Sequence, residues 1–331
     1  KKKSSRGCTI TRRRSTMKNT FLRILCTVLT MLLAAALLGG CMGITGDPTD
    51  TKKIGDPTSS GSTTTGDADP ASTAAPGTET TGPAAPPTVA EQILVDRDGI
   101  KITLKSLEDV PIWGLGLKML IENNSGKDII ATCRNLVIND YMIGADMSAT
   151  IANGKKSNEI FYINQSSLDD AGITVIEKIE LGFSFADSGY NTMFTEKPAE
   201  IKTSAFSGKA FAKADEGKEL LNRDGIRIVG KYIKNDTLMG KEIMLFIENT
   251  GDKDITVFCD DISVNGFMVT SMFSQTVCAG KMAVDGVTIF SSDLEKNGIT
   301  DIKDVELKFR VRYADSFNEI FTTDAIAFSV S

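Results

Sequence analysis

The 331-residue sequence contains no histidine and only one tryptophan. Without histidine, the chain cannot use Ser-His-Asp or Cys-His catalysis, a histidine-ligated zinc ion or proton transfer by imidazole. The chain also has little continuous apolar sequence. Its most apolar stretch, residues 24–38, has 15 residues, whereas a helix needs about 20 to cross a bilayer. These absences exclude several common hydrolase mechanisms and favour a membrane anchor other than a spanning helix.

The apolar stretch runs into Leu38-Gly39-Gly40-Cys41, a set of small residues before a cysteine. A positively charged segment, a short apolar core and a small-residue cleavage site are typical of a signal peptide. The four residues resemble the lipobox of bacterial lipoproteins, which implies a diacylglyceryl group on the Cys41 thiol and cleavage just before it. Two acyl chains give stable membrane attachment. We therefore predict a protein held in the cell membrane by the lipid on Cys41 and facing the extracellular side.

The charged residues are distributed unevenly along the chain. Residues 1–40 hold nine of the 37 basic residues and none of the 43 acidic ones, so the chain from Cys41 onward carries a formal net charge of −15. A negative surface repels phosphate backbones and anionic lipid headgroups. The sequence therefore argues against nucleic acid as a partner and leaves membrane attachment to the lipid.

A leader and a low-complexity stalk precede the rest of the chain. With translation predicted to start at Met17, residues 1–40 comprise upstream residues and the lipoprotein signal peptide. Residues 41–90 consist mainly of Thr, Gly, Pro, Ser, Ala and Asp and include no aromatic residue. Such a segment cannot bury enough apolar area to offset its ordering entropy. We predict a disordered stalk with a reach of roughly 40 Å.

Residues 91–331 contain an internal duplication, in which residues of the first copy match those 126 positions later. The register holds without a gap from Arg97 to Phe183, and Ile121-Glu122-Asn123, for example, matches Ile247-Glu248-Asn249. We refer to residues 91–206 as repeat 1 and to residues 219–331 as repeat 2, joined by a connector at 207–218. Each repeat is long enough for a core of its own and is predicted to be one domain.

Both repeats carry the patterns of antiparallel sheet. Apolar and polar residues alternate over 178–185 and 304–311, as on a strand with one buried face. Residues 117–121 and 243–247 are apolar at both parities, which predicts central strands covered on both faces, each followed by a hairpin turn. Asp98-Gly99 and Asp224-Gly225 predict a further hairpin at the start of each repeat.

Two irregularities are predicted in each repeat. The parity of the apolar residues changes at Arg134-Asn135 and at Asp260-Asp261, which indicates a β-bulge. Ser166 and Ser292 each precede an acid by three residues, which predicts one short helical turn capped by that serine. About seven strands per repeat favour an all-β fold of two tandem immunoglobulin-like antiparallel β-sandwich domains, with a small closed barrel as the alternative.

The turn and core motifs carry a family resemblance. The segments Asp-Gly-Ile-Lys-Ile-Thr at 98–103, Leu-Ile-Glu-Asn-Asn-Ser-Gly-Lys-Asp-Ile at 120–129 and Val-Ile-Asn-Asp-Tyr-Met at 137–142 resemble the telokin-like, immunoglobulin-like domains of unknown function on lipoproteins of Gram-positive bacteria. The resemblance covers most of both repeats. It implies a fold and a location, and it brings no catalytic residue or ligand.

Three cysteines would remain beside the acylated Cys41 after cleavage. Cys133 is predicted to be a buried strand residue, because free cysteine packs as a small hydrophobe. Cys259 and Cys278 are candidates for a disulfide, which an extracellular compartment permits. Since Ala152 stands at the place of Cys278 in repeat 1, the fold does not need that bond, and both alternatives stay open.

Other residue types offer weaker candidates for chemistry. Asp252, Asp254, Asp260 and Asp261 could bind calcium but lack the alternating ligand pattern of a calcium loop, so we interpret them as turn-forming and solvated acids. The methionines, among which Met142 matches Met268, could bind cuprous copper but are better explained by packing. No metal site and no cofactor are predicted.

Trp113 is the remaining candidate, and it is the best single contact residue if exposed and a core residue if buried. Trp113, Arg134, Cys278 and the connector have no matching counterpart in the other repeat, so a specific contact is expected in one repeat or at their junction. The main hypothesis is a non-enzymatic binding or structural module of the cell envelope, with an envelope protein or glycan as partner. The alternatives are a carboxylate-based cell-wall or glycan hydrolase and a metal-binding lipoprotein.

Overall fold

The computed structural model describes residues 51–53, 86–110, 114–144 and 147–330. Cys41, the residues before it and Trp113 lie outside the described residues, so the predictions made on them stay predictions. The described residues are mostly β-strands, with two short helices, α2 (Gln165–Asp170) and α3 (Ser291–Lys296). None of the helices among the described residues is long and apolar enough to cross a membrane. Both repeats belong to one compact unit, residues 50–331.

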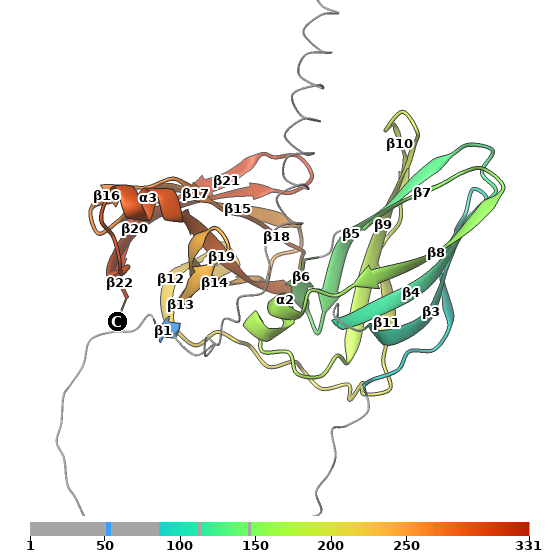
Figure 1. The fold of residues 1–331 in the computed structure, drawn as a ribbon, viewed down its shortest axis with the longest axis horizontal. Helices are drawn as coiled ribbons and strands as arrows, with labels where there is room; N and C mark the ends of the chain where they lie inside the picture. Colours follow the sequence, from blue (N-terminus) through green and yellow to red (C-terminus); the bar gives the residue numbers. More distant parts are fainter. Residues whose placement is uncertain (1–50, 54–85, 111–113, 145–146, 331) are drawn as a thin grey trace, which may run out of the picture. The chain divides into compact units, whose positions relative to one another are not determined.

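Repeat 1 has two sheets that enclose one core (Figure 1). The first is antiparallel, has the order β2-β3-β4-β8, and comprises β2 (Gln92–Arg97), β3 (Ile100–Val110), β4 (Gly114–Asn123) and β8 (Lys155–Tyr162). The second contains β5 (Ile129–Ile138), β6 (Tyr141–Ile143), β7 (Ser148–Ile151), β9 (Lys178–Asp187), β10 (Thr192–Thr195) and β11 (Ala199–Lys202). Alternate side chains of both sheets are buried between them, as the period-two pattern predicts.

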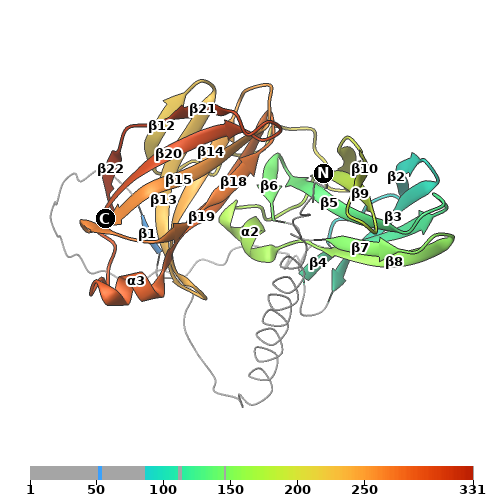
Figure 2. The ribbon, with the colours of Figure 1, turned by 90° about the horizontal axis from the view of Figure 1, so that it is seen from above.

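Repeat 2 repeats this arrangement (Figure 2). One sheet has β12 (Lys218–Arg223), β13 (Ile226–Thr237), β14 (Gly240–Asn249), β17 (Ser271–Met272) and β19 (Lys281–Phe290). The other has six strands, namely β15 (Ile255–Val264), β16 (Phe267–Met268), β18 (Ser274–Val277), β20 (Asp304–Tyr313), β21 (Glu319–Thr322) and β22 (Ile326–Ser329). A short strand, β1 (Thr51–Lys53), pairs with β13, although it lies within the segment predicted to be a disordered stalk.

The opening hairpins and the bulges are confirmed. Asp98-Gly99 and Asp224-Gly225 join β2 to β3 and β12 to β13, and all four residues have positive φ, as a type I′ turn requires. The β5–β9 register shifts between Cys133 and Leu136, and the β15–β20 register shifts at the equivalent place. The change of apolar parity in the sequence therefore located both bulges.

The predicted hairpin after residues 117–121 and 243–247 is wrong. β4 pairs with β3 and β8, and β14 pairs with β13 and β19, so the turn carries the chain to the other sheet. In each repeat a buried asparagine stabilises the turn that links the two sheets. The Asn123 side chain donates to the carbonyls of Lys127 and Ile151 at 2.7 and 2.8 Å. Asn249 makes the same two bonds in repeat 2. Turn-forming residues mark a reversal but do not say whether the strands on either side pair.

The two helices form, but their caps differ from the prediction. Asn164 is the N-cap of α2, and its side chain accepts a hydrogen bond from the backbone N–H of Ser167 at 3.1 Å. α3 has Phe290 at the N-cap and no side-chain cap, because the phenylalanine side chain has no hydrogen-bond acceptor. The Asp293 carboxylate accepts from the backbone N–H of Thr270. The predicted serine caps are therefore wrong in both repeats.

The two central strands differ in burial. β14 is buried on both faces, as predicted, whereas Lys118, Leu120 and Glu122 leave one face of β4 partly exposed. The prediction of a doubly covered strand is therefore wrong for repeat 1. Matching sequences are covered differently because one face of repeat 2 packs against repeat 1.

Candidate functional site: the junction of the repeats and its free counterpart

The junction is built on a parallel strand pair that joins the two repeats. β6 of repeat 1 pairs with β19 of repeat 2, with Tyr141 opposite Met282, and the N–H of Met282 donates to the carbonyl of Asp140 at 2.9 Å. The pairing makes one twelve-stranded sheet from strands of both repeats. The Tyr141 ring packs edge-on against Phe246, with centroids 6.5 Å apart.

Apolar side chains of repeat 2 extend the core of repeat 1 at this place. The outward-facing residues of β13, β14 and β19 that are buried there are Val229, Met244, Phe246, Met282 and Val284. Burial of such a face stabilises the contact by roughly 25 cal/mol for each square ångström of apolar surface removed from water. The junction is therefore a continuous hydrophobic interface rather than a chance contact of two loops.

Four charged side chains close the junction at the β6–β19 pair. The ammonium of Lys281 contacts Asp140 Oδ1 at 2.8 Å and Glu180 Oε1 at 2.5 Å, and Lys178 contacts the same two carboxylates at 2.7 and 3.0 Å. Partial burial alone would raise the pKa of Asp140, but the hydrogen bonds and charges of both lysines together hold that pKa below its usual value. The network joins the repeats by inserting a lysine of β19 between two acids of repeat 1.

The connector is fixed to the same strand. The Tyr141 hydroxyl donates to the carbonyl of Ala212 at 3.0 Å and accepts from the N–H of Ala214 at 2.7 Å. Lys231, which is 7% exposed, donates to the Ala214 carbonyl, and burial lowers the pKa of its ammonium. The connector predicted at 207–218 is thus held by buried polar groups of both repeats.

Two further contacts join the repeats. The Lys234 ammonium on β13 contacts Asp170 at the end of α2 at 2.8 Å. The Asn135 amide donates to the Cys278 sulfur at 3.3 Å. Cys278 therefore lies at the junction, one of the two places where residues without a matching counterpart were expected to make a specific contact.

A partly buried carboxyl group lies near this contact. Asp285 on β19 lines a cavity of about 310 Å³ together with residues of both repeats, including Arg134, Asn135 and Ser167. Burial, together with the neighbouring carboxylates of Glu242 and Asp170, raises the pKa of Asp285 to about 6. Among the described residues that line this cavity, Asp285 is the one acid, whereas glycoside hydrolysis requires a pair of carboxyl groups.

The positions that form the junction in repeat 1 are exposed in repeat 2. Phe267 and Met268 of β16 match Tyr141 and Met142 of β6 and pair with β15 as those pair with β5. Phe267 is 48% and Met268 66% exposed, whereas Tyr141 is 1% exposed. The edge of β16 that corresponds to the β19-binding edge of β6 carries no strand among the described residues.

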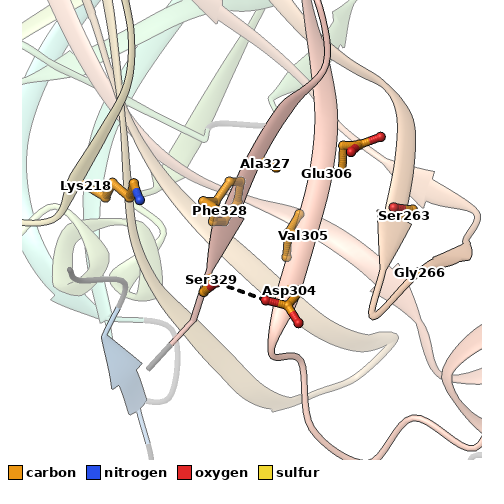
Figure 3. A pocket seen from close by; sticks show the side chains of 9 residues that line it. All are labelled: Lys218, Ser263, Gly266, Asp304, Val305, Glu306, Ala327, Phe328 and Ser329. Atoms are coloured by element: carbon orange, nitrogen blue, oxygen red, sulfur yellow. Dashed lines mark hydrogen bonds between the residues drawn. The ribbon is translucent and has the colours of Figure 1, made fainter. Parts of the chain in front are cut away.

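The acids of this free counterpart line a cavity (Figure 3). Its volume is about 330 Å³, and Asp304 and Glu306 line it from β20, with Lys218 from β12. Glu306 matches Glu180, and Asp304 matches Lys178. Asp304 accepts a hydrogen bond from the Ser329 hydroxyl at 2.9 Å, whereas Glu306 forms no hydrogen bond or ion pair with another described residue. The acids of repeat 1 form ion pairs with Lys281 of repeat 2, whereas Asp304 and Glu306 at the equivalent surface of repeat 2 are exposed to solvent.

The three cysteines among the described residues, Cys133, Cys259 and Cys278, are free thiols. β18 pairs with β15 so that Val277 lies opposite Ile255, which leaves Cys278 several residues along the strand direction from Cys259. Five residues of strand span about 16 Å, and a disulfide needs Cα atoms within about 7 Å. The register therefore favours the unbonded alternative. Burial raises the pKa of Cys133 and of Cys278 to about 12, as expected of packed thiols.

Three of the four acids considered as calcium ligands, Asp254, Asp260 and Asp261, have other partners. Asp260 binds Arg310 through two hydrogen bonds of 2.5 and 3.0 Å, and Asp261 contacts Lys308 at 2.9 Å. Asp254 accepts from the N–H of Ala279 at 2.8 Å. Among the described residues no group of three or more Cys, Asp or Glu side chains is placed to hold a metal ion. The structure uses these acids in turns and ion pairs.

Asp304 and Glu306 are two acids at alternate positions of β20 that line the same cavity. A general acid in such a pair is kept protonated by an apolar environment, as in a buried pocket. Both side chains are instead exposed on a solvated strand face. The arrangement suits recognition of a cation better than transfer of a proton.

The comparisons with known proteins give little guidance. No family model and no curated protein matches the sequence. Among solved structures, the Salmonella enterica SafA pilin in complex with the SafB chaperone is 12% identical, with 65% of this chain and 88% of that chain covered and a TM-score of 0.19. Red sea bream transglutaminase is 8% identical, with 73% of this chain but 31% of that chain covered and a TM-score of 0.18. TM-scores this low establish neither a shared fold nor a shared function.

The sequence did not single out Phe267, Glu306 or Lys281. Met268 was identified as the match of Met142, and both methionines were explained by packing. The useful signal was the change at outward-facing positions, where Lys156 of repeat 1 is replaced by Met282 in repeat 2. When an outer face carries an apolar residue in one repeat and a polar residue in the other, the apolar face is expected to be covered by a partner.

Proposed function

We propose that the chain is a lipid-anchored extracellular surface protein that binds a partner of the cell envelope without catalysing a reaction. In this proposal, its two repeats are tandem immunoglobulin-like β-sandwich domains, and the lipid on Cys41 and the stalk hold them beyond the membrane. The observation that carries the proposal is the exposed counterpart of the junction in repeat 2. Phe267, Met268 and Glu306 there stand in water at positions that are used for contact in repeat 1.

The kind of site supports binding rather than chemistry. An exposed aromatic residue next to a methionine and two carboxylates combines an apolar anchor with a charged rim, as protein interfaces do. Cys133, Cys259 and Cys278 are packed or hydrogen-bonded. The partly buried acid Asp285 lies apart, at the junction, and no other acid among the described residues lines its cavity.

Binding is tested with the chain from residue 41 carrying Cys41→Ser, which removes the lipid. Purified cell-wall polymers and purified envelope proteins are presented as a panel, and saturable binding is measured by surface plasmon resonance. We expect Phe267→Ser to weaken binding to the responding component by about tenfold or more. Phe317→Ser is the matched control, because Phe317 is 64% exposed at the turn between β20 and β21, away from the site.

Two results would overturn the proposal. Release of a product from any polymer of the panel would make the chain an enzyme. Equal binding by the Phe267→Ser variant and its control would place the contact elsewhere. The anchor is tested separately: a labelled fatty acid should be incorporated by cells expressing the natural chain and not by cells expressing the Cys41→Ser variant.

A further inference from the structure

The junction between the repeats has two sides, and each side has an unused counterpart. Repeat 1 contributes β6 and the acids Asp140 and Glu180, whose counterparts are β16 and the cavity at Glu306 in repeat 2. Repeat 2 contributes β19 with Lys281, whose counterpart in repeat 1 is β8 with Lys155. Among the described residues, β8 pairs only with β4, so its other edge is free.

From this symmetry we infer that a second copy of the chain docks on the first, head to tail. In this docking, β8 of one chain lies parallel to β16 of the next. The inference names a partner for the binding site of the proposed function. Transfer of the register places Lys156 opposite Phe267, as Met282 lies opposite Tyr141. The ammonium of Lys155 then reaches the cavity lined by Glu306, as that of Lys281 reaches Glu180.

The charges of the two surfaces are complementary. In repeat 1 the acceptor combines one lysine, Lys178, with two acids and takes one ammonium. In repeat 2 its counterpart has Asp304 in place of that lysine and Gly266 in place of Asp140, so the free acceptor also combines two acids, Asp304 and Glu306, with one lysine, Lys218. The β8 edge supplies two exposed lysines, Lys155 and Lys156, of which Lys156 also pairs with Glu122 of the same chain. Opposite charges on two patches of one chain favour contact between different copies.

An apolar contact accompanies the charges. Tyr141 packs on Phe246 at the junction, and the counterparts of these residues are Phe267 and Leu120. Leu120 is only partly buried on the outer face of β4. Docking would cover both side chains, which lie on the unused counterparts of the two junction surfaces.

The contact is heterologous, because one patch of the chain meets a different patch of the next. Such a contact does not close on itself in a dimer and adds further copies to form a ring or an open filament. The β8 edge is not equivalent to β19 in every respect, since Lys156 and Asn158 stand where Met282 and Val284 are buried at the junction. We therefore expect the association between chains to be weaker than the internal junction, to depend on salt and to continue beyond the dimer.

The test is sedimentation velocity on the chain from residue 41 with Cys41→Ser, from about 1 µM to a few hundred µM at low salt. The weight-average sedimentation coefficient should rise with concentration beyond the dimer value and fall back as salt is added. Either of two charge reversals should abolish association. One is Glu306→Lys on the β16 surface, and the other is Lys155→Glu combined with Lys156→Glu on the β8 edge. Asp315→Lys is the matched control, an exposed acid at the far end of β20 with the same charge change.

Mixing the two charge-reversed proteins gives the decisive result. Each variant alone carries charge of one sign on both its β16 surface and its β8 edge, and it should remain monomeric. In a mixture, the positive β16 surface of the Glu306→Lys variant can bind the negative β8 edge of the variant with Lys155→Glu and Lys156→Glu. Association should therefore return in the mixture. Circular dichroism that matches the natural chain shows that each variant is folded, which is expected because all three residues are exposed.

Monomers at every concentration, or association that survives both reversals, would overturn the inference. A mixture that stays monomeric would overturn the assigned pairing of β8 with β16. These failures are distinguishable from failure of the proposed function. A chain that stays monomeric but loses binding to an envelope component on Phe267→Ser would retain that function and have a different partner.

Discussion

Replacement of Asp285 by asparagine should stabilise the protein at neutral pH. The side chain lies on β19, and its carboxyl oxygen accepts a hydrogen bond from the N–H of Gly286 at 2.8 Å. Burial raises its pKa from the ordinary 3.8 to about 6, with Glu242 and Asp170 adding to the rise and Lys234 opposing it. Asparagine keeps the shape and can accept the same hydrogen bond, but it carries no charge to bury.

The magnitude follows from the two pKa values. In the unfolded chain the carboxyl group ionises near 3.8, and in the folded chain near 6. Below pH 3.8 it is protonated in both states and costs nothing. Between these values the folded state binds the proton more tightly, so the free energy of unfolding falls as the pH rises. Above pH 6 the group is ionised in both states, and the folded protein bears the full penalty of about 3 kcal/mol.

The assay is urea unfolding of the natural chain and the Asp285→Asn variant at several pH values from 3.5 to 7.5. The variant should be more stable by up to about 3 kcal/mol at pH 7, and the difference should shrink below pH 6 and vanish near pH 3.5. Comparison at each pH cancels the other acids, which titrate in both proteins. Asp315→Asn, at an exposed turn position, should change stability by less than about 0.5 kcal/mol throughout.

A difference that is independent of pH would refute the reasoning, because a lost hydrogen bond or a packing change does not titrate. A variant that is less stable at pH 7 would refute it more directly. It would mean that the Asp285 carboxylate is stabilised by its surroundings and has a depressed pKa.

Three further predictions concern the junction, the thiols and one turn. Lys281→Met should lower the free energy of unfolding by about 2–4 kcal/mol, because it leaves two partly buried carboxylates with one lysine; unchanged thermal unfolding would contradict the network. In the Cys41→Ser chain from residue 41, mass spectrometry after denaturation without reductant should find three alkylatable thiols, and fewer would indicate a disulfide. Gly240→Ala should cost more than about 2 kcal/mol, since at a φ of +148° its Cβ would lie 2.1 Å from the Ile289 carbonyl oxygen. Gly280→Ala, with open space around it, should cost only about 1 kcal/mol in the same unfolding assay.

Much of the strand pattern could be predicted because it depends on local rules. Alternation over 178–185 identified a strand with one buried face, and Asp98-Gly99 identified a turn with two positive φ angles. The change of parity at Arg134-Asn135 identified a bulge, since only an extra residue can return the apolar set to the core. Each of these features is fixed by residues within a few positions of one another.

The features that the sequence did not predict depend on contacts distant in the chain. The turn after Asn123 contains the residues of a hairpin, but its asparagine bonds to Ile151, 28 positions away, and the strand crosses to the other sheet. The burial of Phe246 depends on Tyr141 of the other repeat. Alignment of the two repeats identifies the core and turn residues that both share, but it does not identify contacts that one repeat makes with the other.

The divergence between the repeats bears on how strongly two chains can associate. At the junction, repeat 2 buries Met244, Met282 and Val284 against repeat 1, whereas repeat 1 has Lys118, Lys156 and Asn158 at these positions. Within one chain the two surfaces are linked covalently, so their effective concentration is high and an apolar, permanent contact carries no risk of aggregation.

Between chains the same apolar face would be an exposed patch and an unprotected strand edge, and lysines are the residues that commonly protect such an edge. Lys155 and Lys156 therefore make the free edge soluble and at the same time complementary to the acids at Asp304 and Glu306. Anchoring to a membrane through Cys41, as proposed, would raise the local concentration of chains. Under that condition a weak contact suffices for association, and it should be lost when the chain is released into dilute solution.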